Sequence, residues 1–428
     1  MLLALLLSLA MPALAQSPAP PATPADCLKA ARDFTSRRQK EMAPLTLEKM
    51  NQITSEKNAQ EKTCAAAFDA KTLTPSGLVS LAQVHGDMGD AVGAAALIDA
   101  VKRHPGATTA DIAGADLLQI TTVLREPKGD ERNARLEKMV DALDALGPAA
   151  FDQQFAAHAS MNSYYRADDI DAGIIKHSTW LINASRAFTP AQRQTTGMTI
   201  ASAHVNMAEA WAGQGMTDTA LAVLRDGKAK WGDINPRPGM NIAEMYFQPE
   251  IERLELVGLP GAAIVAPRWF NGPASKELPM PGHVTLLEFT AHWCGPCRES
   301  YPGVNRLRAK YAPQGFRVVL STQLYGYFGA ERNLPPEDEV ARDKGYFAEH
   351  ELSDVPVAIG NKVNARVVNG KVEYDPAKDP NDVAYRVGGI PQIQLIDKQG
   401  RIRLIMVGYD DANEARLAKM IETLLNEK

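Results

Sequence analysis

Val284–Thr290 (VTLLEFT) runs directly into Ala291–Cys297 (AHWCGPC), and this stretch decides how the C-terminal part of the chain folds. The first segment has the length and the apolar content of a buried β-strand. The second segment carries two cysteines separated by a Gly-Pro pair. The sequence therefore predicts a Cys-x-x-Cys motif at a junction between a strand and a helix.

The chemistry of this motif follows from its place at the start of a helix. Cys294 would sit at the helix N-terminus, where unpaired N–H groups and the helix dipole stabilise a thiolate, the species that attacks disulfides. Cys297 follows one turn later and is placed to attack the resulting mixed disulfide. We expect thiol-disulfide exchange in which Cys294 is the nucleophile and Cys297 the resolving cysteine.

Two other interpretations of the motif are weaker. A structural zinc site needs four ligands and usually a second Cys-x-x-Cys or a His pair. The chain has four cysteines in all, and the other two, Cys27 and Cys64, lie far away in the sequence. A merely structural disulfide would leave the strand–motif–helix context unexplained. We expect no bound metal and no cofactor other than the Cys294–Cys297 disulfide.

The pentapeptide Trp293–Cys297 is identical to the active-site sequence of thioredoxins, and the chain here resembles the thioredoxin superfamily. The resemblance implies that Glu288 is the buried acid that takes a proton from the second cysteine. It also implies that Pro302 kinks the active-site helix and that Ile390-Pro391 forms the cis-proline loop. The substrate-positioning residues implied by the resemblance are Trp293, Gly295, Pro296, Ile390 and Pro391.

Within that superfamily the region resembles the exported TlpA/ResA-type redoxins and covers about residues 260–428. The resemblance implies an α/β thioredoxin fold, opened by a leading strand within Ile264–Gly272, with an insertion before the cis-proline. That insertion, from about Leu324 to Arg386, contains a predicted helix over Pro336–Glu349. A closing hairpin is expected from Gln392 to Val407, and an amphipathic helix over Glu414–Leu425.

The first 25 residues resemble a targeting segment. Residues 1–15 contain an apolar run and the small-x-small sequence Ala13-Leu14-Ala15, which predicts a cleavable signal peptide. Residues 16–25 are rich in Pro and Ala and predict an extended linker. We expect an exported, periplasmic protein.

Residues 26–259 predict an all-α domain, because apolar residues recur at helical spacing and alternating β-branched runs are missing. A break at Gly86–Asp90 predicts a helix hairpin, with Ala91–Val101 as its second helix. The breaks are only weakly similar to tetratricopeptide repeats, because their spacing is irregular. This irregular array is predicted either to bind a protein partner or to serve as a spacer or dimerisation domain.

Cys27 and Cys64 both lie beside apolar residues at helical spacing in this region. In an oxidising compartment they can close a structural disulfide between the first two helices, worth about 4 kcal/mol in the loop-entropy account. Two free buried thiols and redox participation are the alternatives.

Composition bounds the remaining possibilities. A chain of 428 residues exceeds one ordinary domain. Its 45% hydrophobic and 23% charged content are typical of globular proteins. The net charge of −5 gives no basic footprint for nucleic acid.

The combined hypothesis is an exported thiol-disulfide oxidoreductase that reduces protein disulfides. Gly295-Pro296 and Ile390 resemble reducing thioredoxins, and the resemblance implies a membrane-embedded electron donor of the DsbD type. His292 leaves the direction of electron flow open, since a cationic imidazole there favours oxidation, whereas an exposed loop histidine has no effect. The alternatives are a disulfide isomerase or oxidase, and a helical protein-binding module with a redox-sensing thioredoxin-like domain.

Overall fold

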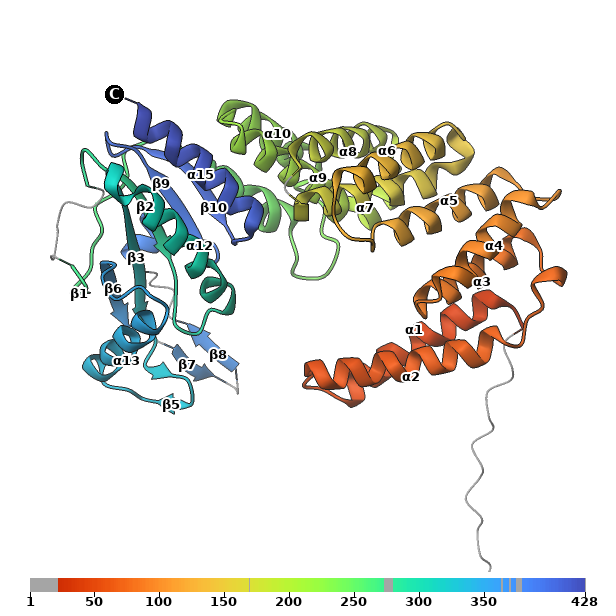
Figure 1. The fold of residues 1–428 in the computed structure, drawn as a ribbon, viewed down its shortest axis with the longest axis horizontal. Helices are drawn as coiled ribbons and strands as arrows, with labels where there is room; N and C mark the ends of the chain where they lie inside the picture. The colour runs from red at the N-terminus through yellow and green to blue at the C-terminus, as the bar shows by residue number, and fades with distance from the viewer. Residues whose placement is uncertain are drawn as a thin grey trace, which may run out of the picture. The chain divides into compact units, whose positions relative to one another are not determined.

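The computed structural model describes residues 22–168, 170–272, 280–362, 365–368, 371–374 and 379–427 (Figure 1). The predicted signal peptide, residues 1–15, lies outside the described residues, as does most of the predicted linker. Helix α1 begins at Pro24, so the linker that was predicted to reach residue 25 is shorter than expected. The reason is local: Thr23 caps the helix through the backbone N–H of Asp26, and Pro24 is tolerated in a first turn.

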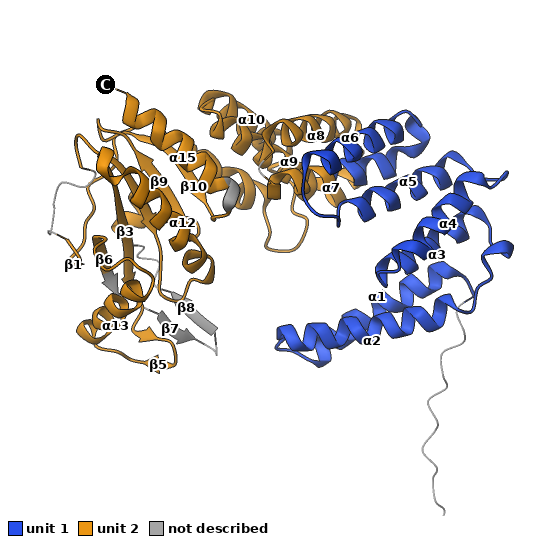
Figure 2. Ribbon diagram, in the orientation of Figure 1, with its two compact units in different colours: residues 1–160 blue, residues 161–428 orange. Residues whose placement is uncertain are grey.

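The chain divides into two compact units, residues 1–160 and residues 161–428 (Figure 2). The division falls inside α7 (Phe151–Asp168) rather than at the domain boundary predicted after residue 259. The change from helices to a sheet does occur near residue 259, between α11 (Gln248–Leu254) and β1 (Arg268–Phe270). The domain boundary therefore stays a prediction.

The first unit is helical over its described residues. Several helices begin with a side-chain cap, as at Thr46, Thr74 and Thr108, whose oxygens accept backbone N–H groups of the first turn. A disulfide between Cys27 and Cys64 joins the first two helices. The helices are α1 (Pro24–Glu41), α2 (Leu47–Ala65), α3 (Pro75–Asp87), α4 (Ala91–Arg103), α5 (Thr109–Val123) and α6 (Asp130–Asp144), followed by the start of α7.

The predicted helix hairpin corresponds to α3 and α4, and the helical character expected up to residue 259 is confirmed for the described residues. In the second unit this region continues as α8 (Asp171–Ala184), α9 (Pro190–Gly213), α10 (Thr217–Trp231), a π-helical turn (Ala243–Phe247) and α11. Similarity to tetratricopeptide repeats stays a prediction.

A six-stranded mixed sheet forms the centre of the C-terminal region, with the order β1-β6-β3-β2-β9-β10. Strands β2, β3 and β6 run parallel, whereas β1, β9 and β10 pair antiparallel with their neighbours. The leading strand is shorter than the segment 264–272 predicted for it. The bounds are β1 (Arg268–Phe270), β2 (Val284–Phe289), β3 (Phe316–Leu324), β6 (Val357–Lys362), β9 (Gln392–Ile396) and β10 (Ile402–Val407).

Helices cover this sheet, and the insertion before the cis-proline adds two small ribbons. The helix predicted over Pro336–Glu349 is confirmed as α13, and the closing hairpin and C-terminal helix are present as expected. The helices are α12 (Gly295–Tyr311), α13 (Pro336–Glu349), α14 (Pro380–Ala384) and α15 (Asp411–Asn426); the ribbons are β4 (Tyr327–Phe328) with β5 (Glu331–Arg332), and β7 (Ala365–Val368) with β8 (Lys371–Tyr374).

Alternation along β2 divides its side chains between two cores. Leu286 belongs to the core that contains residues of α12, α13 and α15, whereas Leu287 and Phe289 belong to a core on the opposite face. Glu288 has the same parity as Leu286, so its carboxyl group lies on the α12 face. All six residues of β2 are buried. A strand that is buried on both faces has a mostly apolar sequence, and in β2 Glu288 is the one acid within it.

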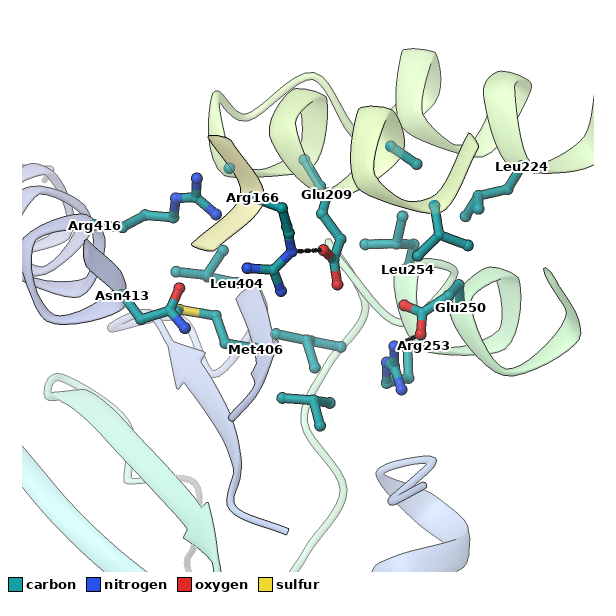
Figure 3. Close-up of a pocket in the computed structure, with 16 residues that line it drawn as sticks. Arg166, Glu209, Leu224, Glu250, Arg253, Leu254, Leu404, Met406, Asn413 and Arg416 are labelled. Carbon is teal, nitrogen blue, oxygen red and sulfur yellow. Dashed lines mark hydrogen bonds and ion pairs between the residues drawn. The ribbon is translucent and has the colours of Figure 1, made fainter. Parts of the chain in front are cut away.

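A second feature of residues 161–428 is a small, highly charged cavity of about 50 Å³ (Figure 3). Arg166 hydrogen-bonds to Glu209, Arg253 pairs with Glu250, and Leu404 and Met406 of β10 line the apolar side. Helices and the edge strand β10 thus share one polar cavity. Among the residues that the structure describes, no helix is long and apolar enough to cross a membrane.

Candidate active site

The two cysteines of the Cys-x-x-Cys motif lie at the start of α12 and are joined in a disulfide. Cys294 is the N-cap residue, and its sulfur accepts a hydrogen bond of 3.1 Å from the backbone N–H of Cys297. Pro296 stands in the first turn, where its missing N–H costs no hydrogen bond. The sulfur of Cys294 therefore faces the positive end of a helix, which stabilises negative charge there after reduction.

Solvent access differs between the cysteines and their neighbours. Cys294 is 4% exposed and Cys297 is fully buried, whereas Trp293 beside them is 49% exposed. An approaching molecule would meet the Trp293 ring first and reach the sulfur of Cys294 before that of Cys297. The order of attack expected from the sequence matches this order of access.

The loop that contains Ile390-Pro391 lies beside Cys294. The peptide bond between these residues is cis, as expected. The carbonyl oxygen of Ile390 lies 3.7 Å from the sulfur of Cys294, and Pro391 begins the chain's path into β9. The structure thus brings Trp293, Cys294, Cys297 and Ile390 together although nearly a hundred residues separate the two segments.

Glu288 is fully buried beneath α12. One carboxylate oxygen accepts a hydrogen bond of 2.7 Å from the hydroxyl of Ser300, and the other has no hydrogen-bond partner. The same hydroxyl lies 2.7 Å from the carbonyl oxygen of Cys297. Ser300 therefore connects the buried acid with the turn of helix that holds the resolving cysteine.

Burial raises the pKa of Glu288 to about 8, and the hydrogen bond from Ser300 opposes part of this effect. The cause is desolvation, which penalises the carboxylate more than the neutral acid. A carboxyl group with such a pKa can hold or release a proton near neutral pH, which is the property that a general acid or base requires.

Two buried hydroxyl groups, those of Thr290 and Tyr301, lie close to this acid. Tyr301 is fully buried and its hydroxyl lies 2.7 Å from that of Thr290. Burial, together with the charge of Glu288, raises the pKa of Tyr301 well above its ordinary range. Tyr301 thus stays neutral at physiological pH.

A groove of about 610 Å³ opens beside the disulfide. Trp293, Tyr325 and Tyr327 line one part of it and the loop of Gly388–Ile390 another, with Trp293 and Tyr325 in edge-to-face contact at 5.4 Å. Asp379 and Asp382 are the charged groups among the described residues of its lining. The groove is large enough for a peptide segment or a small molecule.

Sequence reasoning missed several of these residues. Ser300 could have been found, because it follows Cys297 by three residues and so lies on the same helical face. Tyr325, Asp379 and Asp382 could not have been found, because tertiary contacts of the insertion place them and no local sequence pattern predicts those contacts.

The suggestion that His292 is an exposed loop residue is wrong. Its side chain is 3% exposed and lies 3.1 Å from a carboxylate oxygen of Asp343. The physical reason is the insertion: α13 and the aromatic rings of Tyr325, Tyr327 and Phe328 pack around the imidazole.

Cys27 and Cys64 take no part in this site. They belong to the other compact unit, where their disulfide joins α1 and α2. Cys27 is 2% exposed and packs with the apolar residues of that unit, which is the environment of an inert structural bridge.

No protein-family model and no curated protein matches the chain. Similar solved structures include a thiol:disulfide interchange protein DsbE from Chlorobium tepidum, with 27% identity over 40% of this chain and 98% of that one, at a TM-score of 0.29. A thioredoxin-like superfamily protein matches with 22% identity over 40% and 97%, at a TM-score of 0.30. A thiol-disulfide isomerase from Corynebacterium glutamicum matches with 20% identity over 40% and 97%, at a TM-score of 0.29.

The fold of the C-terminal region follows from its own topology. A parallel β2–α12–β3 unit, an insertion, a cis-proline beside paired cysteines, a closing hairpin and a final helix occur in the expected order. This part of the chain has a thioredoxin-like fold.

Proposed function

We propose that this protein is a thiol-disulfide oxidoreductase that reduces disulfides in other proteins through Cys294 and Cys297. The observation that carries the proposal is the placement of a buried cysteine pair at a helix N-terminus, with a buried acid of raised pKa under the same helix. Nucleophile, resolving group and proton acceptor are then held by adjacent elements, β2 and α12.

The reaction begins from the dithiol form. The thiolate of Cys294 attacks one sulfur of the substrate disulfide, that S–S bond breaks, and the first substrate sulfur leaves as a thiolate that takes up a proton. A mixed disulfide between Cys294 and the substrate remains. The carbonyl oxygen of Ile390 lies 3.7 Å from the sulfur at which this bond forms.

Resolution requires a second thiolate at a buried position. Cys297 gives its proton to ionised Glu288, whose nearest hydrogen-bonded neighbour is Ser300, and then attacks the sulfur of Cys294. The second substrate thiolate leaves, and the Cys294–Cys297 disulfide seen in the structure is the product. Two electrons pass to the substrate, and the protein must be reduced again by a thiol donor before the next turnover.

Export belongs to the same proposal. The predicted signal peptide of residues 1–15 would direct the chain to the periplasm, and a second disulfide at Cys27–Cys64 suits an oxidising compartment. A reductase there depends on a membrane-embedded electron donor, which we infer to be of the DsbD type.

Two cysteine variants test the mechanism. With insulin as substrate, Cys294→Ser abolishes disulfide reduction, whereas Cys297→Ser accumulates a covalent mixed disulfide that is visible on a non-reducing gel. The matched control is the Cys27→Ala, Cys64→Ala double variant, which keeps its turnover. Full insulin reduction by either active-site variant would contradict the assignment of Cys294 and Cys297 as the redox pair.

A further inference from the structure

Three ionisable side chains meet next to the active-site loop without any role in the exchange reaction. They are His292, Glu339 and Asp343, and their ligand atoms all lie within 4.8 Å of one another. All are buried: the side chains of His292 and Asp343 are 3% and 1% exposed, and Glu339 is fully buried. Buried ionisable groups are uncommon unless something pairs with them, so this cluster calls for a partner.

Two elements deliver these side chains. His292 precedes Cys294 by two residues on the loop between β2 and α12, while Glu339 and Asp343 both belong to α13 in the insertion. The two acids are four residues apart in the helix, which places their carboxyl groups on one face. They therefore place two carboxyl groups beside one imidazole.

Water is largely excluded from the cluster. The rings of Tyr325, Tyr327 and Phe328 lie 5.6, 5.4 and 4.8 Å from the imidazole, centroid to centroid. An unpaired charge in such surroundings is costly, because no solvent can stabilise it.

The hydrogen bonds of the cluster are incomplete. Glu339 accepts hydrogen bonds from the backbone N–H groups of Tyr325 and Gly326, at 2.5 and 2.7 Å. In contrast, both ring nitrogens of His292 and both carboxylate oxygens of Asp343 are buried without a hydrogen-bond partner. Nδ1 of His292 lies 3.1 Å from Asp343 Oδ1, which is an ion-pair distance when the imidazole is protonated. Buried polar atoms of His292 and Asp343 that lack a hydrogen-bond partner thus lie close to one another and to Glu339.

The charges are unbalanced as well. Glu339 and Asp343 bring two negative charges when ionised, and no Lys or Arg among the described residues forms an ion pair with either of them. Buried carboxylates of this kind are found paired with a cation or bound to a metal ion. A protonated His292 would offset one charge and leave its second ring nitrogen an unpartnered buried donor.

The sequence predicted no bound metal; from this cluster we propose instead that His292, Glu339 and Asp343 form a binding site for a divalent first-row metal ion of the Zn²⁺ or Mn²⁺ type. One imidazole nitrogen and two carboxylate oxygens are a donor set that such ions accept, with water completing the coordination. The ion neutralises the buried carboxylates and binds polar atoms of His292 and Asp343 that have no hydrogen-bond partner. It also ties α13 to the loop that carries Cys294, so the site lies beside the redox centre without involving its sulfurs.

Zinc titration of the oxidised full-length protein tests the proposal. In that state both disulfides are closed, so no thiol can bind the metal. After treatment with EDTA and its removal, ZnCl₂ is added during isothermal titration calorimetry, and bound zinc is counted by mass spectrometry. The expected result is one Zn²⁺ per chain with a Kd in the micromolar range or below, and Mn²⁺ competing for the same site.

Variants assign the binding to this cluster. His292→Gln and Asp343→Asn keep the side-chain volumes and are expected to weaken binding by more than about 100-fold, beyond the loss typical of an outer-shell partner. The matched control is Asp338→Asn, an exposed acid on the same helix, which leaves binding unchanged. Absence of stoichiometric zinc, or equal binding in all four proteins, would overturn the proposal.

X-ray absorption of the zinc-loaded wild-type protein decides the case if the variants fail to fold. One imidazole and otherwise oxygen ligands are expected in the coordination shell. A shell that contains sulfur, or more than one imidazole, places the metal elsewhere and rejects the site.

Discussion

Glu288 is the residue whose chemistry depends most on its position. It is an acid in the middle of a fully buried strand, and the alternation of β2 turns it toward α12 rather than toward the opposite core. Burial raises its pKa to about 8 from an ordinary value near 4.5. The site therefore holds a neutral acid at low pH that becomes a base as the pH rises.

Replacing Glu288 by Gln is expected to change how stability depends on pH. Between about pH 4.5 and 8 the unfolded chain loses this proton and the folded chain keeps it, so the free energy of unfolding of the wild type falls as the pH rises. The total fall from this group is roughly 3–5 kcal/mol. The Glu288→Gln variant has no such ionisation, so its free energy of unfolding increases relative to that of the wild type between about pH 4.5 and 8. Urea unfolding of the two oxidised proteins measures this difference. If the free energies of unfolding of the two proteins changed in parallel with pH, the raised pKa of Glu288 would be contradicted.

Ser300 is expected to set the pH at which Glu288 ionises. Its hydroxyl stabilises the carboxylate, so Ser300→Ala raises the pKa of Glu288 further. A hydrogen bond to a charged group of about 1.5 kcal/mol corresponds to roughly one pH unit. The pH at which the mixed disulfide resolves half-maximally should rise by that amount in stopped-flow measurements.

The control for this experiment is Glu299→Gln, an exposed neighbour on α12. It should leave the midpoint of resolution in place. If Ser300→Ala behaved like this control, Ser300 would be a structural residue without influence on the proton acceptor.

Single elements were predictable where a local pattern determines them. The apolar run of β2, the Gly-Pro start of α12 and the amphipathic α13 and α15 all occur where the sequence places them. The short strands of the insertion were not predictable, because β4 and β5 consist of two residues each and depend on pairing partners. The surroundings of His292 were missed for the same reason: its neighbours come from α13 and from Tyr325–Phe328, all more than thirty residues along the chain.

At the scale of helices, the Cys27–Cys64 disulfide links α1 and α2 across a sequence separation of 37 residues. In the loop-entropy account its removal costs about 4 kcal/mol of unfolding free energy. The Cys27→Ala, Cys64→Ala variant should therefore unfold at lower urea concentration in its N-terminal helices, while its rate of insulin reduction per folded molecule stays unchanged. A parallel loss of turnover would show that these cysteines take part in exchange.

The short helix α14 contributes a carboxylate to the groove beside the disulfide. Asp382 accepts a hydrogen bond of 3.2 Å from Gln323, and with Asp379 it gives the described lining a negative charge. A positive group about 6 Å from such a charge gains roughly 1 kcal/mol in a partly solvated site, or about fivefold in affinity. Asp382→Asn should raise KM for cystine peptides with a neighbouring Lys by that factor. Peptides with Glu at the same position should not show the increase, and Asp338→Asn serves as the control variant.

At the scale of the whole chain, the residues of the candidate site lie in one region and helices make up most of the rest. The residues of the site all lie in 288–391, whereas the helices from α1 to α11 contain no residue of it. The binding or spacer role of the helical region stays a prediction, as does its boundary after residue 259. The sequence allows a prediction of the chemistry because cysteine spacing is local, but the groove and the His292 cluster depend on how the insertion packs.

The reduction potential of the Cys294–Cys297 pair tests the central claim most directly. The wild-type protein is equilibrated with dithiothreitol or glutathione mixtures, and the thiols are alkylated and quantified peptide by peptide, which keeps Cys27 and Cys64 out of the signal. A reductase is expected to have a potential near that of thioredoxin, about −270 mV. A value at or above about −180 mV would make the protein an isomerase or oxidase and contradict the proposed direction of electron flow.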